Sequence, residues 1–128
     1  MPVFFVCAGL LGLLAVVLGL NVARMRGAKK VNLGDGGDPE MLAAIRAHAN
    51  LIEWAPICLL LIYIASDFYG FWIVACLSAV LLAARVLHAG GLLGTIPKGR
   101  VLGATGTAVV LAIASVLLIV SGINLRQY

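Results

Sequence analysis

Three polar side chains stand at helical spacing inside an otherwise apolar stretch. Arg46, Asn50 and Glu53 are separated by four and then three residues, so a helix places them on one face. At the helical rise per residue this stripe is about 10 Å long, which suits a small peptide-sized ligand better than a pore. Arginine forks bind carboxylates, a carboxylate binds an ammonium group and an amide binds another amide. The stripe therefore predicts a site for a zwitterionic ligand.

A second apolar stretch carries Arg85 and His88, three residues apart and on one helical face. An arginine at the centre of a bilayer costs about 2.5–3.5 kcal/mol, so such groups usually face a protein interior or a wet cavity. An alternative is that Arg46 or Arg85 pairs with Glu53 only to fix helix packing. That alternative explains the charges, but not a fork donor, an amide and a carboxylate on one face. We expect His48 to point away from the stripe, whereas a structural and a ligand-binding role stay open for His88.

These residues must be positioned by membrane helices. The chain is 63% hydrophobic and 11% charged, against roughly 45–50% and 25% in soluble proteins, and its mean hydropathy is +1.14. A helix needs about 20 mostly apolar residues to cross a bilayer. The sequence predicts an all-α integral membrane four-helix bundle that forms a single domain over residues 1–128. Its spans are expected at residues 3–23, 41–65, 71–93 and 101–124.

The net charge of +4 does not predict a nucleic-acid partner, because the basic residues lie beside the spans. Two loops carry most of them: Arg24, Arg26, Lys29 and Lys30 after the first span, and Lys98 and Arg100 before the fourth. The opposite side carries Asp67 and the terminal Arg126. The positive-inside rule then places both basic loops in the cytoplasm and both termini outside.

The ends of the spans have local signals. The first span lacks the basic start of a signal peptide and its apolar run is about twice too long for one, so we expect it to remain as a membrane helix. Glycines between Asn32 and Asp38 predict a turn with positive φ, and Asp38 followed by Pro39 predicts a helix start close to Met41. Cys7 and the two other cysteines lie in apolar runs without ligand spacing, which predicts packing roles and no metal site.

The segment Arg46 to Pro56 resembles the second-helix signature of the MAPEG family, the membrane-associated proteins in eicosanoid and glutathione metabolism. The signature is an Arg, an Asn four residues later, a Glu three later and a Pro three after that, and this chain meets it in full. The resemblance covers the whole chain and includes Ala84 to His88 and a basic loop with a proline before the last span. The stretch Gly34 to Gly37 is most similar to a small uncharacterised bacterial branch.

The resemblance implies a homotrimer in the bacterial inner membrane. It would bind glutathione between subunits, in a site that opens to the cytoplasm. The residues that would hold the glutathione backbone are Arg46, Asn50 and Glu53. Arg24 could reach a carboxylate from the adjoining subunit. The positions near the ligand would also include Trp54, Arg85 and His88.

Catalysis in the family relies on an arginine at the start of the last helix that stabilises the glutathione thiolate. Arg100 is the best candidate here, with Lys98 as a rival. Leu92 stands where some eicosanoid-producing members have a tyrosine, so leukotriene synthesis is not implied. The first hypothesis is a detoxifying glutathione transferase or peroxidase that acts on small lipophilic electrophiles. The second is a non-enzymatic trimer that binds glutathione or membrane lipid, or scaffolds a partner. A channel is disfavoured, because one short polar stripe gives no continuous path.

Overall fold

The described chain is built from four long helices. A computed structural model describes residues 1–125 and contains α1 (Pro2–Lys29), α2 (Pro39–Ala65), α3 (Phe71–Leu92) and α4 (Gly99–Leu125). Each of the four is long and apolar enough to cross a bilayer, which confirms the all-helical prediction. Arg126, one of the charges used to assign topology, lies outside the described residues.

The first helix continues past residue 23, where the first span was expected to end. Arg24 to Lys29 contains good helix formers and no proline, so nothing stops the helix before Lys30. That residue takes the left-handed conformation, with φ 54°, and its backbone N–H donates to the carbonyl of Arg26. The basic residues that follow the apolar run are therefore held on a helix and its cap.

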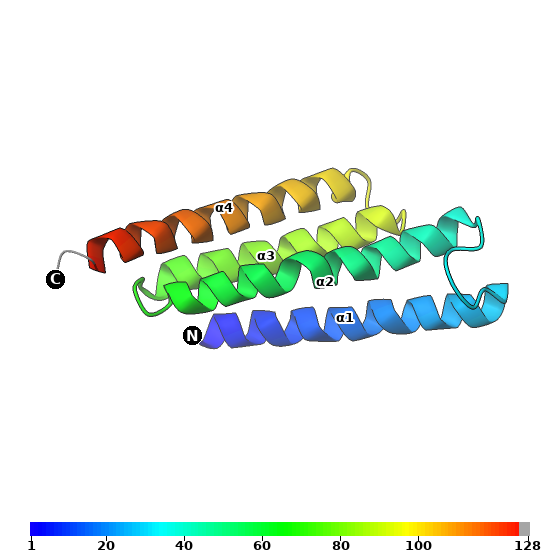
Figure 1. Cartoon of the computed structure of the whole chain (residues 1–128), viewed down its shortest axis with the longest axis horizontal. Coiled ribbons are helices and arrows are strands. Elements are labelled where there is room, and N and C mark those ends of the chain that lie inside the picture. The colour runs from blue at the N-terminus through cyan, green and yellow to red at the C-terminus, as the bar shows by residue number, and fades with distance from the viewer. Residues whose placement is uncertain (126–128) are drawn as a thin grey trace.

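Consecutive helices run antiparallel, and α2 and α3 lie between α1 and α4 (Figure 1). α1 packs against α2 and α3, and α4 packs against α3 and α2, whereas α1 and α4 do not touch within residues 1–125. Both basic loops lie at one end of the bundle, which we call the basic end. The α2–α3 turn and the start of α1 lie at the other (Figure 1).

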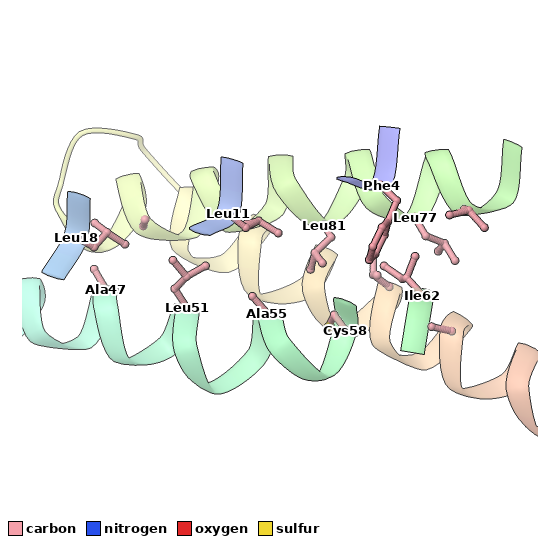
Figure 2. Packing of buried hydrophobic residues seen from close by; sticks show 14 residues of the cluster. Phe4, Leu11, Leu18, Ala47, Leu51, Ala55, Cys58, Ile62, Leu77 and Leu81 are labelled. Carbon is pink, nitrogen blue, oxygen red and sulfur yellow. The ribbon is translucent and has the colours of Figure 1, made fainter. Parts of the chain in front are cut away.

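The buried hydrophobic core involves all four helices and extends from Phe4 of α1 to Val110 and Ala114 of α4. Figure 2 shows Leu11 and Leu18 of α1 facing Ala47 and Leu51 of α2, with Leu81 of α3 beside them. Small residues let helix backbones approach closely where the bilayer supplies no hydrophobic driving force. The outer faces are also apolar, as on α1, where Leu20 is 65% exposed in the single chain, and they are the surfaces available to lipid or to other subunits.

Two local predictions for the α1–α2 loop are confirmed. Gly34, Gly36 and Gly37 all have positive φ, between 63° and 73°. Asp38 is the N-cap of α2, and its side chain accepts a hydrogen bond of 2.9 Å from the backbone N–H of Met41. The helix therefore begins at Pro39 because its first free N–H groups are capped there.

An ion pair joins the end of α1 to the start of α2. Lys29 Nζ lies 2.6 Å from the carboxylate of Asp38 and 2.9 Å from that of Glu40. The hydrogen bond from Lys29 is the main reason that the pKa of Asp38 lies below its ordinary value, and the N–H of Met41 is the second. The same contacts raise the pKa of Lys29. Both groups are therefore charged at neutral pH, and the contact holds the basic end together.

Two partly buried hydrogen bonds join the α2–α3 turn to α4 at the opposite end of the bundle. The hydroxyl of Tyr69, in the α2–α3 turn, donates to the carbonyl of Leu117 at 2.8 Å, and Ser121 Oγ donates to the Tyr69 hydroxyl at 3.0 Å. These hydrogen bonds fix the turn against α4.

The α3–α4 pair comes closest where glycines replace side chains. A Cβ added at Gly103 would lie 2.5 Å from the backbone nitrogen and Cβ of His88, and closer still to the carbonyl of Ala84. A Cβ at Gly91 would overlap the backbone of Arg100. The absence of these two side chains sets the distance between α3 and α4.

Gly103→Ala should destabilise the protein, because the added methyl group meets backbone atoms that cannot rotate away. Overpacking of this kind costs about 1–3 kcal/mol, and we expect a lower midpoint of thermal unfolding for the detergent-solubilised chain. Gly122→Ala is the matched control on α4, because nothing lies within 4 Å of a Cβ added there. Equal effects of the two substitutions would contradict the close α3–α4 approach.

The Lys29–Asp38 contact predicts a pH-dependent stability. Because the folded pKa of Asp38 lies below its ordinary value of 3.8, its contribution is fully present above that pH and is lost as the pH falls through the lower folded value. Asp38→Asn keeps an N-cap residue but removes the charge. The variant should unfold at a lower temperature than the native chain at neutral pH, and the difference should shrink in acid. Asp35→Asn, in the same loop but outside the ion pair, should show no such convergence.

Candidate functional site

A cavity of about 400 Å³ opens at the basic end between α2, α3 and α4. We call it the polar cavity because charged and amide side chains line it. Its walls are Pro39, Leu42, Ala43, Arg46 and Asn50 from α2, His88, Gly91 and Leu92 from α3, and Arg100 from α4. Two of the three stripe residues, Arg46 and Asn50, thus share this cavity with Arg100 from the first turn of α4.

A second cavity of about 340 Å³ continues along α2 and α4, away from the basic end. We call it the inner cavity. Its walls are Asn50, Trp54, Arg85, His88, Ala104, Thr105, Thr107 and Ala108. Asn50 and His88 belong to both cavities, so a ligand in one would lie against the same two side chains as a ligand in the other.

The positions of the lining residues follow from the helices that carry them. Arg46 and Asn50 lie one turn apart on α2, so both reach the polar cavity. Arg100 is in the first turn of α4, and the close approach at Gly91 brings the backbone of that turn against α3. Lys98 precedes the helix with φ 60° and lines neither cavity. Of the two basic residues considered as the thiolate partner, Arg100 is therefore the one that faces the polar cavity.

Arg85 is buried beneath Asn50. Its guanidinium donates from Nη1 to Asn50 Oδ1 at 2.8 Å and from Nη2 to the carbonyl of Gly103 at 3.3 Å. The residue is 2% exposed, and its Nε has no hydrogen-bond partner. No carboxylate pairs with Arg85 among residues 1–125. The buried cation is therefore held by oxygen dipoles from α2 and α4.

Glu53 pairs with Arg46 rather than with Arg85. The Arg46 Nη2 to Glu53 Oε2 distance is 3.6 Å, and both side chains are half exposed. Pairs with this exposure contribute about 0–1 kcal/mol to stability, so the contact does little to fix the bundle. Glu53 lines neither cavity, but its partner lines the polar one. The pair therefore lies beside the polar cavity, with both groups available to a ligand.

The two histidines have different surroundings. A Cβ at Gly19 would lie 3.4 Å from His48 Nε2, which places His48 against α1 and confirms that it points away from the stripe. His88 is 6% exposed and lines both cavities. Its position is compatible with either of the roles left open by the sequence.

Two further candidates lie apart from the polar cavity. Trp54 is 38% exposed and lines the inner cavity. Arg24 is exposed on α1, where its Nη2 donates to Asn21 Oδ1 at 3.2 Å. It lines neither cavity of this chain, so Arg24 could serve such a site only in an adjoining subunit.

Three positions near the cavities were not assigned to the site from the sequence, although Gly103 was expected to allow close helix contacts. Gly103 and Thr107 look like ordinary small residues of an apolar helix, yet the Gly103 carbonyl accepts from both Arg85 and the Thr107 hydroxyl. Gly91 gives the polar cavity a wall without a side chain. The signal in the sequence was a glycine near the end of the third span, Gly91, and another near the start of the fourth, Gly103, which together favour a close approach of these two helices.

Comparison with known proteins gives two findings. The model of the MAPEG family matches residues 4–120. The chain is also 37% identical over 82 residues to a protein named inner membrane protein YecN, in Escherichia coli strain K12 and in the O6:H1 strain CFT073. The matched stretch covers 63% of this chain and 63% of each relative, so it spans less than two thirds of their length.

Proposed function

The chain belongs to the MAPEG family of integral membrane proteins, and from that premise we propose that it binds glutathione in the polar cavity and transfers it to lipophilic electrophiles. The observation that carries the proposal is the convergence of Arg46, Asn50 and Arg100 on one cavity. A volume of about 400 Å³ lies within the usual range for small-molecule sites.

The chemistry of glutathione matches the groups around this cavity. The tripeptide carries two carboxylates, one ammonium group, two amides and a thiol. Arg46 offers a fork for a carboxylate, and Glu53 beside it offers an acceptor for the ammonium group. Because Glu53 and Arg46 are already in contact at 3.6 Å, a zwitterion could bind both without leaving either charge unpaired.

Arg100 would supply the catalytic step. A free thiol has a pKa near 8.5, and a neighbouring cation lowers it and raises the fraction of thiolate at neutral pH. The thiol proton passes to solvent, and the thiolate forms a bond to the electrophilic carbon while the leaving group departs. With a peroxide as acceptor, two glutathione molecules are oxidised to the disulfide, and the peroxide is reduced to an alcohol and water.

The lipophilic substrate would occupy the inner cavity. Its walls include Trp54, Ala104 and Ala108, and it meets the polar cavity at Asn50 and His88. An apolar molecule dissolved in the bilayer would thus reach the side chains that border the glutathione site.

The assembly belongs to the same proposal. We expect a homotrimer in a bacterial inner membrane, with the basic end and the polar cavity on the cytoplasmic side and both termini outside. This orientation opens the cavity to the compartment that holds glutathione and gives the loops their positive-inside bias. Arg24 would then reach the site of an adjoining subunit.

Substitution of Arg100 tests the catalytic step. Purified protein should conjugate glutathione to chlorodinitrobenzene, and Arg100→Ala should lower turnover about 10²-fold, as the loss of a transition-state donor typically does. Lys98→Ala is the matched control, because Lys98 lies two residues away and outside the cavity. Absence of turnover in the native protein, or equal turnover in Arg100→Ala, would refute the enzymatic proposal.

A second candidate function is a trimer that binds glutathione or lipid without catalysis. It is favoured by the exposure of Arg100 at the rim of the cavity, since an exposed cation lowers a thiol pKa less than a buried one. Calorimetry should show saturable glutathione binding that Glu53→Ala abolishes and that Asp67→Ala, in the turn at the opposite end, leaves unchanged. Binding without turnover supports this candidate. No binding would refute both ligand assignments and leave the polar residues as packing elements.

A further inference from the structure

We propose that Arg85 is a positioning residue, which fixes the side-chain amide of Asn50 so that its NH₂ group faces the polar cavity. The Asn50 NH₂ group would then bind only a hydrogen-bond acceptor of the ligand, either a carboxylate or a peptide carbonyl. The inference deepens the proposed function and rests on it for the identity of the ligand, but not for the orientation of the amide.

The Arg85–Asn50 contact has a defined polarity. A guanidinium has five N–H donors and no acceptor, so the atom of the amide that faces it has to be the oxygen. Nη1 of Arg85 lies 2.8 Å from Asn50 Oδ1 and 3.4 Å from the Asn50 backbone carbonyl. An amide rotated by half a turn would place NH₂ against the guanidinium, donor against donor, and would leave the buried cation without its shortest contact.

The position of the Arg85 side chain is restrained by its burial and by α4. Its side chain is 2% exposed, and its other terminal nitrogen donates to the carbonyl of Gly103. α4 approaches α3 so closely at this point that a Cβ at Gly103 would overlap α3. The guanidinium is therefore held from two helices, and it transfers that restraint to the amide.

The side of the Asn50 amide that faces away from Arg85 is open to a ligand. Asn50 is partly exposed and lines the polar cavity together with Arg46 and Arg100. With Oδ1 directed at Arg85, the group left for the cavity is NH₂. The guanidinium groups of Arg46 and Arg100 and the NH₂ group of Asn50 are then three hydrogen-bond donors around one cavity. They favour an oxygen of the ligand over its ammonium group or amide N–H. The sequence predicted that Asn50 binds an amide group of the ligand. The orientation of Asn50 makes this more specific, because its NH₂ group would bind the carbonyl oxygen of that amide.

The orientation can be tested without a ligand by comparing Asn50→Asp with Asn50→Ala in the full-length detergent-solubilised chain. Aspartate keeps an oxygen toward Arg85, so the thermal midpoint of Asn50→Asp should equal or exceed that of the native protein. Alanine leaves Arg85 without its best acceptor and should lower the midpoint by several degrees. If both variants are destabilised equally, the proposed orientation is wrong.

The role in recognition is tested by calorimetry with reduced glutathione. Asn50→Asp replaces the outward NH₂ by a charged oxygen, and its affinity should fall at least tenfold although the fold is intact. Arg85→Lys should lower the affinity several-fold in the native background and should have no further effect in an Asn50→Ala background, because a positioning residue acts only through its partner. A purely structural Arg85 would cost the same affinity in both backgrounds.

The outcomes separate the two proposals. If the native protein does not bind glutathione, the proposed function fails, while the thermal comparison still decides the orientation of the amide. If the native protein binds and Asn50→Asp binds equally well, the proposed function stands and the selection of an acceptor by Asn50 is refuted.

Discussion

The charge of Arg85 has to be accommodated inside a bundle of apolar helices where water is scarce, and the arrangement around the cavities depends on how this is done. A buried cation without a carboxylate needs oxygen atoms from its own chain. Asn50 supplies one from α2, and the backbone of Gly103 supplies another from α4. Both helices therefore have to lie beside α3 at the same level, and this places the start of α4 with Arg100 opposite the polar stripe of α2.

The same contact separates two environments. On one side of Asn50 and His88 lie charged groups near the basic end, and on the other lie Trp54 and small residues of α4. The proposed conjugation would bring one polar and one lipophilic reactant together. The two cavities meet at Asn50 and His88, so these two side chains would lie between the reactants.

Local features were predictable from the sequence and contacts between helices were not. The capping by Asp38 and the positive φ of the loop glycines follow from residues near each other in the chain. The direction of His48 followed from helical periodicity alone. The Arg85–Asn50 bond joins residues 35 positions apart, and its existence depends on how α2 and α3 are rotated about their axes. Sequence spacing left Glu53 with two possible arginine partners, and only the packed helices select Arg46.

Gly103 contributes to the structure in two ways at a single position. Its missing side chain sets the spacing of α3 and α4, and its carbonyl accepts from Arg85 and Thr107. The spacing of α3 and α4 and the hydrogen bond to Arg85 therefore cannot change separately. A larger residue at position 103 would separate the helices and move the carbonyl oxygen away from the guanidinium. Among descendants of such a chain, position 103 should stay glycine wherever position 85 stays arginine, because a larger residue would move the accepting carbonyl away from the guanidinium.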